Sequence, residues 1–190
     1  MNIGLFFGSF NPVHTGHLII ANIMAENAGV DQVWFVVSPQ NPFKSNRALA
    51  HEFDRYDMVR LAIEDDPKLR VSDVEFQMPR PSYTIDTLTY LQEQHPEHAF
   101  SIILGSDNLV HFEKWKNYEQ ILQHYKILVY QRPGDTEHAL FQHPSVSVIE
   151  APLLDISATF IRQMIKDGKS IRYMVPTAVE DFIRDKKLFQ

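Results

Sequence analysis

Apolar residues occur along this chain in short blocks that alternate with amphipathic, helix-like segments. The first block covers residues 2–7, a helical pattern follows over 17–28 and ends at Gly29, and a second block covers 32–37. Blocks that are apolar at nearly every position are typical of strands that helices cover on both faces of a parallel sheet. The chain is therefore predicted to begin with a strand, a helix and a strand.

The same alternation continues as far as residue 130. We expect, in order, a helix at 53–66 that Pro67 ends, a strand at 70–76, a helix at 83–95, and strands at 99–106 and 126–130. Alternating strands and helices predict an α/β fold class with a doubly wound, mostly parallel, Rossmann-like sheet.

The last third of the chain changes character. From about residue 155 it is helical, with one helix at 157–168 between a Ser157 cap and a Gly168 stop, and another at 176–187 with Pro176 in its first turn. No linker or internal repeat interrupts residues 1–190, so a single domain is expected. The segments 38–50 and 131–145 concentrate Pro, Asn and Gly, and we expect mobile loops there.

Composition limits the classes of partner. The 190 residues are 44% hydrophobic and carry a formal net charge of −6, which argues against a broad nucleic-acid surface or an anionic-membrane surface. An anionic ligand must therefore meet a local positive site. No cysteine is present, so disulfides, thiolate zinc sites and a cysteine nucleophile are excluded. No basic leader and no apolar run of membrane-spanning length is visible, and a cytoplasmic location is expected.

Candidate chemistry gathers in the segment GSFNPVHTGH, residues 8–17, which follows the first strand. In an open parallel sheet, ligands bind beyond the carboxyl ends of the strands. Gly8 allows a close backbone approach, and Gly16 and His17 begin a helix whose free amides favour a phosphate. His14 and His17 are three residues apart, so both imidazoles can face that anion. Histidines at this spacing are more often ordinary surface or core residues, and a zinc site would need further ligands that are not apparent nearby.

The whole pattern is more specific than its parts, and five more segments accompany it in order. They are NPFK ending at Lys44, PSYTIDTL at 81–88, LGSDNLVHFEKW at 104–115, YQRPG around Arg132, and ISATFIR at 156–162. Together these motifs resemble the bacterial nicotinate mononucleotide adenylyltransferases of the nucleotidylyltransferase superfamily. The resemblance covers nearly the whole chain.

The resemblance implies a nucleotidylyltransferase fold and a reaction in which ATP and nicotinate mononucleotide give nicotinate adenine dinucleotide and pyrophosphate, a step of NAD biosynthesis. It implies catalytic roles for His17, His14 and Lys44. The implied ATP contacts are Gly8, Ser9, Phe10, His14, His17, Gly105, Asp107, Ser157, Thr159 and Arg162. The implied mononucleotide contacts are Ser9, Lys44, Tyr83, Thr84, Trp115 and Arg132. Magnesium is expected to arrive with ATP, held by phosphates and water without protein ligands.

Other interpretations remain open at this point. Lys44 and Arg132 could be solvated surface cations, Ser157 an ordinary helix cap, and Trp115 a packing residue. A pantetheine-phosphate adenylyltransferase shares the opening motif, and a class I aminoacyl-tRNA synthetase fragment has a similar HTGH segment. A nucleotide-binding module without catalytic activity is a third alternative. The oligomeric state stays open, a homo-oligomer included.

Overall fold

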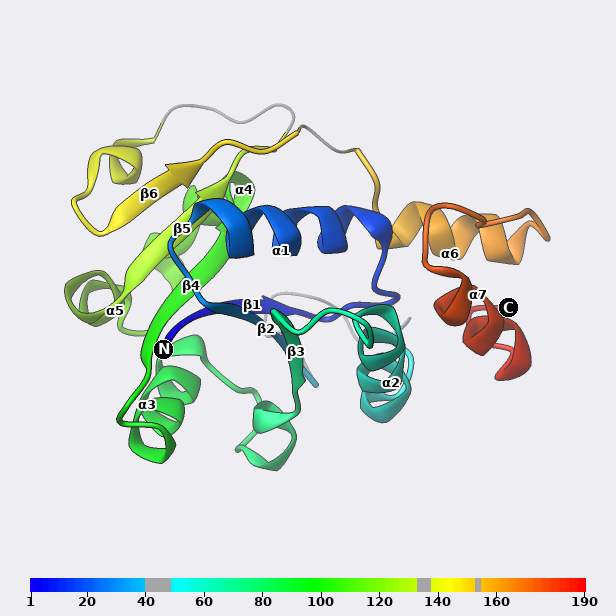
Figure 1. The fold of residues 1–190 in the computed structure, drawn as a ribbon, viewed down its shortest axis with the longest axis horizontal. Helices are drawn as coiled ribbons and strands as arrows, with labels where there is room; N and C mark the ends of the chain where they lie inside the picture. The colour runs from blue at the N-terminus through cyan, green and yellow to red at the C-terminus, as the bar shows by residue number, and fades with distance from the viewer. Residues whose placement is uncertain (40–48, 133–137, 153–154) are drawn as a thin grey trace.

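A computed structural model describes residues 1–39, 49–132, 138–152 and 155–190. Within these residues six strands form one sheet in the order β3-β2-β1-β4-β5-β6 (Figure 1). The strands are β1 (Asn2–Gly8), β2 (Gln32–Val37), β3 (Leu69–Ser72), β4 (Ala99–Gly105), β5 (Lys126–Tyr130) and β6 (Val146–Ile149). Every neighbouring pair is parallel. The predicted doubly wound parallel sheet is confirmed, and its order reverses between β1 and β4.

Helices cover both faces of this sheet, as Figure 1 shows. The α-helices of the described residues are α1 (Thr15–Asn27), α2 (Glu52–Ala62), α3 (Thr84–Gln94), α4 (Ser106–Leu109), α5 (Tyr118–His124), α6 (Ala158–Lys166) and α7 (Thr177–Asp185), and α6 and α7 lie together to one side of the sheet (Figure 1). Apolar side chains of α1, α2, α6 and α7 form one core with Phe6 and Phe35 of the sheet. Those of α3 and α5 form a second core with Ile3 and Leu5. The near-continuous apolar strands are explained, because the central strands β1, β2, β4 and β5 contribute side chains to both cores.

Local sequence signals set the ends of the C-terminal helices. Ser157 precedes α6, and its hydroxyl accepts a hydrogen bond from the Phe160 amide at 3.2 Å, which satisfies one free donor of the first turn. Gly168 follows with φ of 65°, a conformation that costs a glycine little. Pro176 was expected in the first turn of the last helix, but it is the residue before α7.

Two expectations about secondary structure are wrong. The strand predicted at 70–76 ends at Ser72, and a short 3₁₀ helix, η2 (Val74–Gln77), follows. The segment 131–145, expected to be a loop, contains a second 3₁₀ helix, η4 (Ala139–Gln142). A third, η3 (Phe112–Lys114), joins α4 to α5. The loop expected at 38–50 falls largely outside the described residues.

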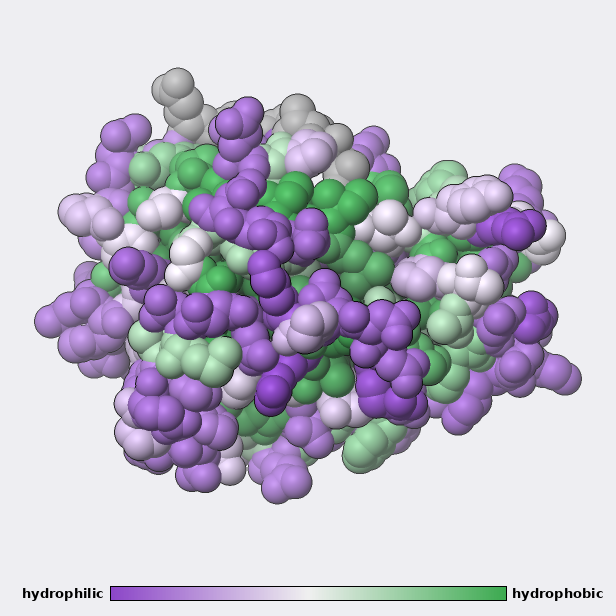
Figure 2. Space-filling model, viewed as in Figure 1, coloured by the Kyte–Doolittle hydropathy of each residue, from purple (hydrophilic) through white to green (hydrophobic). Residues whose placement is uncertain are grey.

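The surface shown in Figure 2 is mostly hydrophilic. Hydrophilic residues cover most of the outer helices on the face shown in Figure 2, with hydrophobic residues visible mainly between them. Among the described residues, none of the helices combines the length and the apolar character that crossing a membrane requires.

Candidate active site

The segment between β1 and α1 lies at the carboxyl edge of the sheet, where the strand order reverses. Phe10 has a φ of 44°, and its buried ring lies edge-on to His17, with ring centroids 5.1 Å apart. A Cβ on Gly8 would lie 2.8 Å from the Phe10 ring. Glycine at this position therefore makes room for Phe10. Phe10 as a whole residue is only 2% exposed, so the structure leaves little of it open to a direct contact with ATP.

His14 and His17 lie together at the start of α1. Their rings are stacked, with centroids 3.7 Å apart and planes 27° apart. The backbone N–H of His14 donates to Nδ1 of His17 at 3.3 Å. Since Nδ1 of His17 is an acceptor here, a neutral His17 carries its proton on Nε2. His17 can therefore donate a hydrogen bond from Nε2 to an anion.

His14 occupies a different environment from His17. It is 3% exposed, and burial, with a smaller contribution from the charge of Arg132, lowers the pKa of its imidazole to about 4. His14 is therefore neutral near pH 7. Its Nδ1 is buried and has no hydrogen-bond partner among the described residues. A Cβ on Gly16 would lie 3.1 Å from that atom, so glycine leaves space for the His14 ring.

Two arginines approach this histidine pair from other parts of the chain. Arg132 follows β5, and its Nη1 lies 3.2 Å from Oδ2 of Asp107. Arg162 of α6 donates from Nη1 to the carbonyl of Asn11 at 2.8 Å and from Nη2 to the Thr159 hydroxyl at 3.2 Å. Burial lowers the pKa of Arg162. The arginine thus links α6 to the opening loop. A hollow there is lined by Phe6, His14, Gly16, His17, Ile20, Tyr130, Gln131, Arg132, Pro152 and Ile156.

A second hollow adjoins the first, and the two share Phe6 and Tyr130 as lining residues. It lies between the ends of β1 and β4 and the start of α3. Its polar and aromatic lining includes Ser38, Glu75, Ser82, Tyr83, Thr84, Asn108, Lys114, Trp115 and Lys116. The helix predicted after Tyr83 begins at Thr84, so free amides of its first turn are available at this hollow. Trp115 is half-buried and packs against Phe112, with ring centroids 4.9 Å apart.

Gly105 is the last residue of β4 and Asp107 lies just after it, in α4, so both are at the end of the strand, as the sequence predicts. A Cβ on Gly105 would collide with Oδ1 of Asp107, so a larger residue here would displace the Asp107 carboxylate. The carboxylate of Asp107 has partners in Arg132 and in the Asn108 side-chain amide, which donates to it at 3.2 Å. Its charge is therefore balanced at the edge of the crevice.

A lysine for which the sequence predicts no role, Lys116, lies beside the start of α3. Nζ of Lys116 lies 2.9 and 3.1 Å from the carboxylate oxygens of Asp86 in the first turn of α3. The same atom lies 4.8 Å from the centroid of the Tyr83 ring. Lys116 thus joins the segment after Trp115 to the helix that begins at Thr84.

The sequence analysis also missed Glu75, a carboxylate that lines the second hollow. Glu75 is 3% exposed, and it accepts hydrogen bonds from the hydroxyls of Ser82 at 2.8 Å and Thr87 at 2.9 Å. Burial raises the pKa of Glu75, and hydrogen bonds from Ser82, Thr87 and Ser38 oppose that rise. In the sequence, the one sign that Glu75 is special is its position between the apolar residues Val74 and Phe76. The strand predicted at 70–76 gave no reason to expect that its carboxylate is buried.

A second missed residue is Arg55 of α2, which is 1% exposed. Its guanidinium donates to four backbone carbonyls: Ser9 at 2.6 Å, Ser38 at 2.8 Å, Ala50 at 3.0 Å and Pro39 at 3.2 Å. Burial lowers the pKa of Arg55 to about 10, so it stays charged near neutrality. Arg55 therefore fixes the opening loop against the end of β2. Its position three residues before Met58 on the buried face of α2 was the available signal.

The structure brings most of the predicted site residues to one crevice. His14, His17 and Arg132 line one part, and Gly8, Tyr83, Thr84, Gly105 and Trp115 line the other. Arg162 donates to the opening loop at the Asn11 carbonyl, and the Thr159 hydroxyl accepts from Arg162. The described residues that line the two hollows do not include Ser9, Phe10, Asp107, Ser157, Thr159 or Arg162. Ser157 caps α6, and the carbonyl of Ser9 binds Arg55. Lys44 lies outside the described residues.

A parallel sheet that reverses order between β1 and β4, with a helix N-terminus and cationic groups at that point, defines the nucleotide-binding class of α/β proteins. Residues 5–164 match the model of the cytidylyltransferase-like family. The chain belongs to this family and, within it, to the nicotinate-nucleotide adenylyltransferases.

The relatives and solved structures agree with that assignment. A probable nicotinate-nucleotide adenylyltransferase of Cytophaga hutchinsonii is 57% identical over the whole chain and 98% of its own length. One of Flavobacterium psychrophilum is 48% identical over the full length of both. The solved Plasmodium falciparum nicotinic acid mononucleotide adenylyltransferase in complex with NaAD matches 99% of this chain and 97% of its own at a TM-score of 0.84 and 22% identity. This last likeness shows the fold.

Proposed function

We propose that the protein transfers the adenylyl group of ATP to nicotinate mononucleotide in the crevice at the ends of β1 and β4. An oxygen of the mononucleotide 5′-phosphate forms a bond to the α-phosphorus, and the bond from that phosphorus to the bridging oxygen of pyrophosphate breaks. The products are nicotinate adenine dinucleotide and pyrophosphate. Because the phosphate is already a nucleophile, catalysis depends on positioning and on stabilising charge.

The histidine pair supplies the hydrogen bonds to the reacting phosphate in this proposal. His17 donates from Nε2 to an oxygen of the α-phosphate, and the bond strengthens as charge shifts in the transition state. The ring of His14 stacks on that of His17, and because His14 is buried, its ring is neutral near pH 7. It holds the imidazole of His17 in place and presents its own ring to the same anion.

The remaining ATP contacts come from three elements. The amides and hydroxyls at the start of α6, with Ser157 and Thr159, bind ATP phosphates together with Arg162. Gly105 leaves space for the nucleotide after β4, and Asp107 accepts a hydrogen bond from a ribose hydroxyl. Lys44 is assigned to the phosphates from its motif alone. Gly8, Ser9 and Phe10 contribute the backbone of the opening loop.

The mononucleotide occupies the second hollow. Trp115 stacks on the pyridine ring, and the free amides at the start of α3, beside Tyr83 and Thr84, bind the nicotinate carboxylate. Lys116 lies beside Tyr83 and pairs with Asp86 in the first turn of α3, so its charge is partly balanced until a carboxylate ligand competes for it. Ser9 and Arg132 bind the mononucleotide phosphate at the junction with the first hollow.

Magnesium enters this proposal as MgATP. The described crevice carboxylates are already engaged, Asp107 by Arg132 and Glu75 by hydroxyl groups. Phosphate oxygens and water therefore hold the ion, which neutralises charge on the leaving pyrophosphate. A cytoplasmic location, where ATP is abundant, belongs to the same proposal.

The observation that supports the proposal most strongly is the stacked His14 and His17 pair at the start of α1, adjoining a hollow with Trp115 and a helix N-terminus. The test is pyrophosphate release from MgATP with a panel of acceptors, with the dinucleotide product identified by mass. We expect nicotinate mononucleotide to be turned over most efficiently. Efficient turnover of phosphopantetheine in its place, or no turnover of any mononucleotide, would overturn the proposal.

A further inference from the structure

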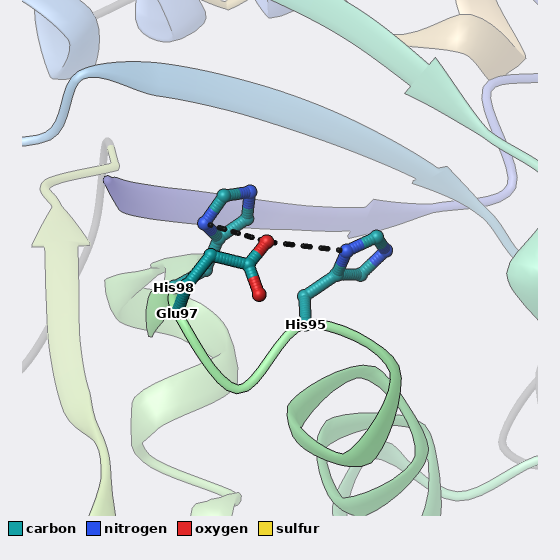
Figure 3. Close-up of side chains that lie close together, drawn as sticks. All are labelled: His95, Glu97 and His98. Atoms are coloured by element: carbon teal, nitrogen blue, oxygen red, sulfur yellow. Dashed lines mark ion pairs between the residues drawn. The ribbon is translucent and has the colours of Figure 1, made fainter.

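Within the described residues, one group of three potential metal ligands lies close together, and it is remote from the crevice. His95, Glu97 and His98 form the turn between α3 and β4, and their candidate ligand atoms all lie within 4.8 Å of one another. Figure 3 shows the Glu97 carboxylate between the two imidazole rings, with one oxygen directed at both. This arrangement is independent of the nucleotide chemistry.

The two distances from Glu97 to the histidines are close to those between ligands of a small divalent cation, while the three candidate ligand atoms together lie within 4.8 Å. Oε1 of Glu97 lies 3.7 Å from Nδ1 of His95 and 3.4 Å from Nδ1 of His98. Zinc bonds to imidazole nitrogen and carboxylate oxygen are about 2.0–2.2 Å long, which places neighbouring ligand atoms of a tetrahedral site about 3.4 Å apart. Small side-chain adjustments would complete the geometry.

The buried side of the group contains a polar atom that needs a partner. Nδ1 of His98 is buried and makes no hydrogen bond to any described residue. An unsatisfied buried polar atom is costly, and native structures contain few of them. A metal ion bound to Nδ1 removes that cost. The side chains of His95 and Glu97 are 40% and 61% exposed, so water can reach the remaining coordination positions.

Neighbouring residues hold the two imidazoles in position. The rings of His95 and His98 are nearly parallel, with centroids 5.4 Å apart. Trp34 of β2 lies edge-on to both of them, at 5.7 and 6.2 Å. The amino group of Met1 donates to the Glu97 carbonyl at 3.4 Å. The ligands are therefore largely positioned before any ion arrives.

We propose that His95, Glu97 and His98 bind a divalent cation that prefers nitrogen ligands, with Zn²⁺ as the probe of choice, and that the ion fastens the end of α3 to the start of β4. Two imidazoles and one carboxylate suit Zn²⁺ or Ni²⁺, whereas Mg²⁺ prefers oxygen ligands. The site is separate from the reaction, because β4 places it about 20 Å from Gly105. Its role is structural.

The alternative is an ion pair between Glu97 and protonated histidines, with no metal. Titrating the chelator-treated, full-length protein with ZnCl₂ in a calorimeter, without nucleotide, separates the two. We expect one saturable site per chain. His95→Gln and Glu97→Gln, both at exposed side chains, should each weaken binding at least about tenfold. His124→Gln, at an exposed histidine of α5 outside the group, is the matched control and should bind like the wild type.

Two further readouts make the test independent of calorimetry. In a Trp115→Phe background, Ni²⁺ should quench the fluorescence of Trp34, and Glu97→Gln should abolish the quenching. Zn²⁺ should raise the melting temperature of the wild type and not that of Glu97→Gln, while Glu97→Gln keeps its rate of pyrophosphate release. Absence of a saturable site would overturn the proposal. Undiminished binding in both His95→Gln and Glu97→Gln would also overturn it, because the ion would then bind elsewhere, for example at His14 and His17.

Discussion

At the scale of single residues, the account depends on His17 acting on the reacting phosphate. Its Nδ1 accepts a hydrogen bond from the His14 amide, so a neutral His17 carries its proton on Nε2. We predict that His17→Ala lowers kcat by about 10²-fold or more and changes the KM for ATP much less, because the contact strengthens mainly in the transition state. Steady-state kinetics of pyrophosphate release measure both. A loss in kcat below about threefold would remove His17 from the mechanism.

The role proposed for Trp115 in binding the mononucleotide can be tested in the same way. Trp115→Ala should raise the KM for nicotinate mononucleotide and leave the KM for ATP nearly unchanged, because the indole stacks only on the pyridine ring. Trp34→Phe is the matched control, since Trp34 contacts His95, His98 and Phe100 at the other end of the sheet. An equal loss of ATP affinity in Trp115→Ala would show that the indole is a packing residue.

His14 makes stability depend on pH. Burial lowers its pKa from 6.5 to about 4, so between these values the unfolded chain binds a proton that the folded protein does not. The contribution of neutral His14 to the free energy of unfolding is therefore fully present above pH 6.5 and falls as the pH drops toward 4. Denaturant unfolding should show wild type losing about 2 kcal/mol more than His14→Gln between pH 7.5 and pH 5. Parallel losses in the two proteins would contradict the burial argument.

At the scale of elements, Arg55 joins α2 to the loops that follow β1 and β2. Arg55→Met leaves four carbonyls without a donor, and we predict a loss of about 3 kcal/mol or more in the free energy of unfolding. Arg60→Met on the same helix should cost less than about 0.5 kcal/mol, because Arg60 is exposed and its ion pair with Asp57 is also exposed. Urea unfolding compares the two. A similar cost for both would show that the buried contacts of Arg55 contribute little.

The elements also show what could be predicted from the sequence. Strands such as β1 and β4 are apolar on both faces, and helix ends such as Ser157 and Gly168 carry local signals, so both were predicted. β6 was missed because it is four residues long, and α5 because it is seven. Glu75 could not be found by periodicity, which treats charged residues as exposed, and the place of Arg55 on the buried face of α2 was the one indication of its burial. Their burial depends on hydroxyls and carbonyls contributed by distant segments.

At the scale of the whole molecule, one parallel sheet separates two chemistries. The carboxyl ends of β1 and β4 carry the histidine pair and the two hollows, and the turn before β4 carries His95, Glu97 and His98 at the opposite edge. The motifs of the crevice come from segments spread over the chain, and the sheet brings them together. That residues 1–190 form a single domain stays a prediction, as do the individual roles of the site residues.

The central claim is that the crevice takes a nicotinate carboxylate at the start of α3. The amides beside Thr84 and the Lys116 cation would favour that carboxylate, while they would meet the carboxamide NH₂ of nicotinamide mononucleotide with another donor. An unpaired buried donor costs roughly 1–3 kcal/mol. The most direct test is kcat/KM for the two mononucleotides with one enzyme preparation. The account predicts a preference of at least about tenfold for the nicotinate form, and equal efficiencies or a preference for nicotinamide would contradict it.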